Sequence, residues 1–180
     1  MQSDALTNFV QPQGAATAVG AAGVVVPIGN VIDMLGVGSG NAPPGIIGRT
    51  TLWGHDPGIG MVKPVLQISI GTTFTTSNAA TGAFALQYAA DTGAGGGYVP
   101  DTWYTSSQTQ AHAVGVLTAG TLLSMDVTPA PPEVKTPRFV RLALIVPAAT
   151  NMDAGSINFA GLTMGPEQNA TVNMPNNYSV

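Results

Sequence analysis

The only adjacent acid–base pair in this sequence is His55–Asp56, and proton transfer is the chemistry that such a pair could perform. The pair follows Trp53 in a loop rich in Gly and Pro. Neighbouring side chains in a strand point to opposite faces, and a general base must lie within hydrogen-bonding distance of its target. The sequence therefore favours a loop packed by Trp53 over a catalytic pair.

Metal and phosphate binding also lack a supporting pattern. The chain has two histidines, His55 and His112, and no cysteine, so thiolate metal sites and disulfides are excluded. Two glycine-rich loops, 36–40 and 93–97, lack the Gly-Lys-Ser/Thr ending and the following helix of a phosphate-binding loop. We predict no catalytic residue, no metal site and no cofactor.

Charged residues are scarce in this 180-residue chain. They make up 8% of it, against about 25% in ordinary soluble domains, and the net charge is −4. A monomer with so few charges would tend to associate, so the composition favours a permanent assembly over a freely diffusing enzyme. Five Lys plus Arg residues cannot form a basic patch, so no direct nucleic-acid partner is expected.

The early part of the chain carries neither a targeting nor a membrane pattern. Residues 1–4 lack a basic region followed by an apolar core, so we expect no signal peptide. The apolar segment 19–37 is interrupted by Pro27, Asn30 and Asp33, so we expect no membrane contact through it.

The segment that would position functional side chains is 136–146, the longest dense apolar run bounded by turn residues. With a period of two, one face is wholly apolar and the other carries Arg141 near its start. Pro137 and Pro147 bound the run, which argues against a helix. We predict a central strand that is buried on one face and mostly covered on the other.

Turn residues separate this strand from other short apolar or alternating segments. About seven or eight strands are expected, and no helix of three or more turns. The segments include 24–33, 62–70, 83–88, 122–127 and 156–164. The pattern predicts a single all-β domain, residues 1–180, built as an antiparallel sandwich or barrel.

The termini and two loops stand outside this pattern. Residues 1–15 and 166–180 are poor in large apolar residues, and we predict an extended arm and an extended tail that contact other chains. The loops 36–60 and 91–105 are long for a compact domain. The candidate intersubunit contacts are aromatic and arginine side chains, namely Phe9, Trp53, Trp103, Tyr104, Arg138, Arg141 and Tyr178.

The two arginines of the central strand have two interpretations. Arg138 and Arg141 lie three residues apart, so they project to opposite faces of a strand. One could pair with Asp126 or Asp153, which would make it structural. One could instead contact another subunit, since Arg is enriched at interfaces. The sequence leaves these interpretations equally weighted.

Several short motifs occur in an order that resembles a known family. They are the opening 4–6 with Phe9, the strand 66–70, the stretch 138–142, and the turn 153–155 before a closing strand. Together they are similar to the jelly-roll capsid cement, or decoration, proteins of tailed bacteriophages, of the Bordetella podovirus type. The resemblance covers most of the chain.

The resemblance implies an antiparallel jelly-roll β-sandwich on the outer capsid surface of a virion, made in the cytoplasm of a bacterial host. It implies a structural protein, not an enzyme, that bridges neighbouring subunits of the major capsid protein and stabilises the shell. It also implies a homo-oligomer, a dimer or trimer at local symmetry axes.

Two other functions stay open on the residues alone. A carbohydrate-binding or adhesion module of jelly-roll type could stack sugars on Trp53, Tyr98, Trp103 and Tyr104. This depends on whether these side chains form an open platform or are buried against a neighbour. The other function, a cupin-like metal enzyme, has too few ligands to be favoured.

Overall fold

We describe the protein from a computed structural model. The residues it describes are 8–10, 16–17, 19–34, 37–41, 51–53, 65–78, 81–93, 99–148 and 151–163. Within them the chain forms twelve strands, one 3-10 helix and no α-helix. The predicted all-β class is therefore confirmed.

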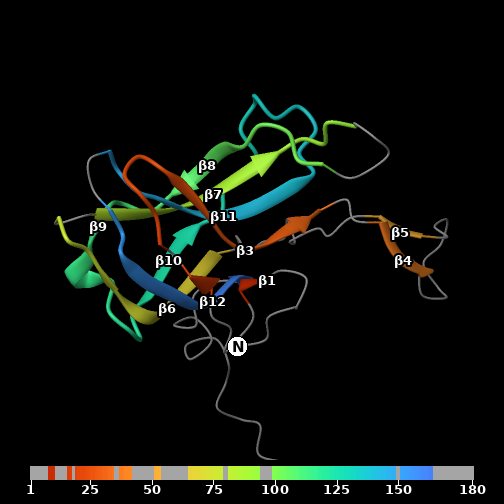
Figure 1. Ribbon diagram of the computed structural model, residues 1–180. Coiled ribbons are helices and arrows are strands. Elements are labelled where there is room, and N and C mark those ends of the chain that lie inside the picture. The colour runs from red at the N-terminus through yellow and green to blue at the C-terminus, as the bar shows by residue number, and fades with distance from the viewer. Residues whose placement is uncertain are drawn as a thin grey trace, which may run out of the picture.

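The strands form two antiparallel sheets that lie face to face (Figure 1). Their facing side chains make one core. The first sheet has the order β1-β12-β6-β10, and β2 also pairs with β12. Its strands are β1 (Asn8–Val10), β12 (Ala154–Thr163), β6 (Val65–Thr75), β10 (Leu122–Asp126) and β2 (Ala16–Thr17). Because the core lies between two antiparallel sheets, the fold is the predicted sandwich.

The second sheet has the order β3-β11-β7-β8, and β9 also pairs with β7. Its strands are β3 (Val25–Asp33), β11 (Phe139–Ile145), β7 (Thr81–Ala89), β8 (Tyr104–Gln108) and β9 (His112–Ala113). The 3-10 helix, Val114–Val116, follows β9. The predicted loop 36–60 contains two more strands, β4 (Val37–Asn41) and β5 (Thr51–Trp53), which pair with each other.

The predicted central strand is β11, which lies between β3 and β7. Its inner face carries Val140, Leu142 and Leu144, all at most 2% exposed and all in the core. Its outer face carries Phe139 and Ala143, which are also buried. Both parts of the prediction for this strand are confirmed, because one face is fully apolar and the other is mostly covered.

The core is filled from both sheets by residues at alternate positions. β6 contributes Leu66, Ile68 and Ile70, each 0% exposed. Phe74 of the first sheet meets Phe84 of the second edge to face, with ring centroids 6.2 Å apart. Such an aromatic pair contributes about 0.5–1.5 kcal/mol beyond the area it buries. These contacts hold the two sheets in one relative position.

The N-terminal strand β1 belongs to this core, which corrects the prediction of an arm through residue 15. β1 pairs with β12, and Phe9 and Val10 are 0% and 5% exposed. The prediction that Phe9 contacts another subunit is wrong, because its side chain is enclosed by its own domain. The rest of the predicted arm, 1–7 and 11–15, and the predicted tail 166–180 lie outside the described residues.

The two sheets also meet along their edges. On one side Gly29 of β3, with φ at +66°, lies against the backbone carbonyl of Phe9 in β1. On the other side the Ser106 hydroxyl of β8 lies 2.7 Å from the carbonyl oxygen of Pro129, which follows β10. The Tyr88 hydroxyl donates to the carbonyl oxygen of Thr128 at 3.3 Å. The sandwich is therefore closed on both sides by polar or backbone contacts.

Candidate partner-binding surface

The outer face of the second sheet, turned away from the first sheet, brings two predicted contact residues together. Arg141 of β11 lies opposite Gln87 of β7, and Gln87 lies opposite Thr105 of β8. Trp103 immediately precedes β8, and its ring lies against the Arg141 guanidinium. We call Arg141, Trp103, Gln87 and Thr105 the outer arginine site.

The geometry of the outer arginine site fixes the guanidinium plane. The Arg141 guanidinium carbon lies 4.2 Å from the centroid of the Trp103 ring, within the range of a cation–π contact. Arg141 Nε donates to Gln87 Oε1 at 3.0 Å, and Gln87 Nε2 donates to Thr105 Oγ1 at 3.1 Å. The ring and the amide therefore restrain Arg141 from two sides.

Gln87 is a site residue that sequence reasoning missed. It is only 5% exposed, and both ends of its amide are hydrogen-bonded, as a buried polar group requires. The available signal was one long polar residue in the otherwise apolar alternation of β7. What the sequence could not show was that β7 and β11 pair in the register that brings Gln87 against Arg141.

Burial lowers the pKa of Arg141 from its ordinary value, because a partly desolvated cation is less stable than one in water. An arginine pKa lies so far above neutrality that the side chain stays charged. The outer arginine site therefore holds a permanent positive charge that is half-buried and fixed in orientation.

Arg138 has a different environment, because it is paired within its own domain. Its Nη2 lies 2.9 Å from Asp33 Oδ2, and its Nη1 lies 2.6 Å from Asp91 Oδ2. These contacts join the end of β3, the residues after β7 and the start of β11. The partners are not Asp126 or Asp153, which the sequence suggested. Arg138 is a structural arginine.

This ion-pair network predicts a pH dependence that involves Asp91. The Gly93 amide, the Val99 amide and Arg138 hold the pKa of the Asp91 carboxyl below its usual range, although desolvation opposes the shift. A carboxylate with a lowered folded-state pKa adds stability above the ordinary value of about 3.9 and loses it as the pH falls. We expect Asp91→Asn to destabilise the protein at neutral pH and to have a smaller effect near about pH 3.

The measurement is urea unfolding of wild type and Asp91→Asn across this pH range. Asp101→Asn is the matched control, because Asp101 is exposed in the following loop and, among the described residues, its carboxylate accepts a hydrogen bond only from the Thr102 hydroxyl. The control should be nearly unchanged at every pH. A deficit of Asp91→Asn that is the same at both ends of the range would contradict the prediction.

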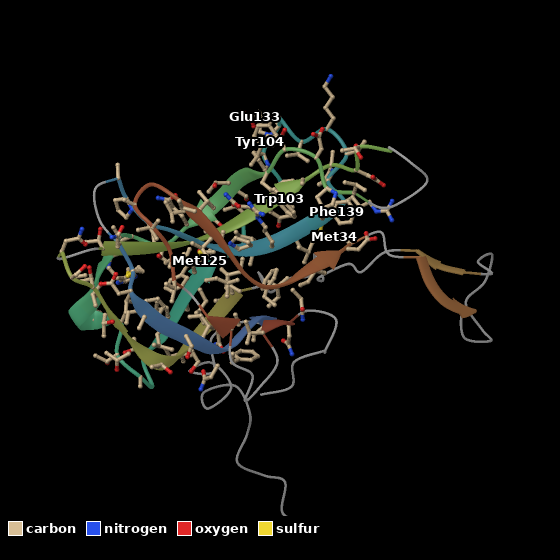
Figure 2. The ribbon with its side chains drawn as sticks, in the orientation of Figure 1. Met34, Trp103, Tyr104, Met125, Glu133 and Phe139 are labelled. Atoms are coloured by element: carbon tan, nitrogen blue, oxygen red, sulfur yellow. The ribbon has the colours of Figure 1, made fainter. Side chains whose placement is uncertain are left out.

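Among the other candidate contacts, Tyr104 does not join the outer arginine site. Tyr104 is 38% exposed and lies opposite Tyr88, whose side chain is in the core, so it starts from the inner face of β8. Figure 2 shows Trp103 over the strands of the second sheet and Tyr104 toward the top of the view. The backbone of Trp53 lies in β5, but its side chain and all of Tyr178 lie outside the described residues.

In the described segments, no group of three His, Cys, Asp or Glu side chains is placed to hold a metal ion. His55 and Asp56 lie outside these segments. No helix in the described part of the chain has the length and apolar character needed to cross a membrane. Compared with known proteins, the sequence matches no family model and no curated protein.

Proposed function

We propose that this protein is a structural virion protein that decorates a phage capsid and bridges neighbouring subunits of the major capsid protein. The observation that carries the proposal is a closed sandwich with very few charges, 8% of the sequence. The outer face of its second sheet holds Arg141 in one orientation against Trp103. A surface of this kind suits lasting contact with other protein chains better than free diffusion.

Exposed aliphatic side chains support the same function. Along the edge strand β3 and just before it, Val24, Val25 and Val31 are 40–46% exposed. Leu122 of β10 and Val116 of the 3-10 helix are more than half exposed. Covering such apolar side chains with a partner lowers the free energy of the complex by about 25 cal/mol for each Å² of apolar surface removed from water.

We further propose that the sandwich is a jelly roll, and the strand order supports this. Without the short or peripheral strands β2, β4, β5 and β9, eight strands remain among the described residues. Numbered in chain order, they run 1-8-3-6 in the first sheet and 2-7-4-5 in the second. Only β7 and β8 are consecutive in one sheet, and every other connection crosses between sheets, as two Greek keys would require.

Carbohydrate binding is the alternative that the aromatic residues raised. A sugar platform needs an aromatic ring with an uncovered face, and the guanidinium of Arg141 occupies one face of Trp103, which leaves at most the other face for a sugar. Tyr104 starts from the opposite face of its strand, so the two rings do not form one platform. These positions favour protein contact over sugar stacking at Trp103.

The test compares capsid shells with and without this protein under heat, chelator and internal DNA pressure. A ligand that binds only the assembled shell stabilises it by mass action, so decorated shells should survive harsher conditions as the protein concentration rises above Kd. Binding should depend weakly on salt, because few charges are available to screen. Bare shells that resist all three stresses equally well would overturn the proposal.

A further inference from the structure

Arg141 has unused hydrogen-bonding capacity. Its Nε is bonded to Gln87, but in the part of the chain that the structure describes no hydrogen bond or carboxylate reaches its Nη1 or Nη2. Arg138, three residues earlier, uses both of its terminal nitrogens on Asp33 and Asp91. A guanidinium carries five N–H donors in a fixed fork, so four donors of Arg141 are unused within the described segments.

The surroundings of Arg141 prepare these donors for a planar anion. Trp103 fixes the plane of the guanidinium, and Gln87 fixes its rotation within that plane. An orientation that exists before binding reduces the entropy lost when a partner arrives. Partial burial also leaves the charge less hydrated, so an opposite charge gains more from approaching it than it would from a lysine in water.

We propose that Arg141 binds the carboxylate of an aspartate or glutamate side chain on the capsid subunit that this protein contacts. The inference rests on the proposed function for the identity of the partner, and on the outer arginine site for the chemistry. A carboxylate matches the guanidinium fork with two parallel hydrogen bonds. The chain itself carries a net charge of −4, so Arg141 is a local cation on an acidic protein and selects an anionic group on its partner.

The first experiment tests the chemistry on the free full-length protein. The probes are a blocked Gly-Asp-Gly tripeptide and its Gly-Asn-Gly counterpart, and the readout is the NMR signal of the Trp103 indole N–H. The Asp peptide should shift this signal saturably and the Asn peptide should not. Arg141→Met should abolish the shift, whereas Lys135→Met, which removes an exposed cation, should retain it. Equal shifts from both peptides would overturn the proposal.

Arg141→Lys separates the fork geometry from the charge. This variant keeps a positive charge but loses the planar donors and the flat stack on Trp103, so its peptide binding should be weaker than that of wild type. Thermal unfolding of each variant checks that it is folded. Full binding by Arg141→Lys would overturn bidentate recognition.

The second experiment identifies the partner by measuring affinity for assembled shells. Arg141→Met should weaken shell binding by about 30-fold or more, and Lys135→Met should change it by less than about twofold. An Arg141→Met variant that loses the peptide but keeps its shell affinity would overturn the capsid partner while leaving the decorating function intact. Wild-type protein that fails to bind shells would instead overturn the proposed function itself.

Two further measurements distinguish other sources of the carboxylate. Sedimentation of wild type and Arg141→Met reports whether a second copy of this chain supplies the carboxylate. If it does, the variant should have a lower oligomeric mass than wild type. Titration with sialyllactose reports whether an acidic sugar supplies it. A lower oligomeric mass of the variant, or sialyllactose binding by wild type, would overturn the proposal if shell affinity were unchanged. The absence of both effects supports it.

Discussion

Phe9→Ala is expected to lower the free energy of unfolding by about 3–5 kcal/mol. The Phe9 side chain is 0% exposed and packs in the core between the two sheets. Its removal takes away apolar contact and leaves a cavity that a packed interior only partly refills. The measurement is urea unfolding of the full-length protein at neutral pH.

The control for this prediction is Val31→Ala, a truncation on the nearby strand β3. Val31 is 46% exposed, so its loss should change stability by no more than about 0.5 kcal/mol. If Phe9→Ala were as mild as this control, β1 would not belong to the core. The N-terminal residues would then be an arm, as the sequence alone suggested.

Gly29→Ala is expected to lower the free energy of unfolding by about 2–5 kcal/mol, because two costs add. Gly29 has φ at +66°, in the left-handed region that L residues disfavour. A β-carbon there would also overlap the backbone carbonyl of Phe9 and lie 2.9 Å from the Val10 side chain. Backbone cannot move aside as a side-chain end can, so β1 and β3 would have to separate.

Gly93→Ala isolates the first of these costs. Gly93 has the same φ of +66°, but a β-carbon added to it meets nothing within 4 Å. This variant should therefore lose only the conformational part, about 1–2 kcal/mol. The difference between the two variants measures the close contact at the β1–β3 edge. A Gly93→Ala loss equal to that of Gly29→Ala would mean that this edge is not tightly closed.

Sequence periodicity was sufficient to predict a strand wherever one face of the strand is apolar and packs against the core. β11, β6 and β7 were predicted because large side chains alternate with small or polar ones, and this pattern follows from strand geometry alone. β3 contains Pro27, and a proline within a sheet is confined to edge strands or bulges. β3 is an edge strand, and its pairing with β11 shifts register between Val140 and Leu142.

Strands without that pattern were missed. β8 runs through Tyr104–Gln108, where Ser, Thr and Gln show no apolar face. β6 continues to Thr75, past the predicted end at residue 70, through mostly polar residues. β1 spans only three residues, too few to show a period. These segments become strands because their backbones hydrogen-bond to neighbouring strands. The pattern of their side chains does not reveal this pairing.

The sequence by itself determined the class of this protein, an all-β sandwich with few charges, because alternation and composition are local properties of the chain. Only the tertiary structure decided the roles of the two arginines. Arg138 meets carboxylates 105 and 47 residues away in the chain, and Arg141 meets Gln87 at a separation of 54. These encounters depend on which strands pair and in what register, and a one-residue shift would turn each side chain to the other face. The fold therefore pairs Arg138 with carboxylates of its own domain and holds Arg141 between the Trp103 ring and the Gln87 amide.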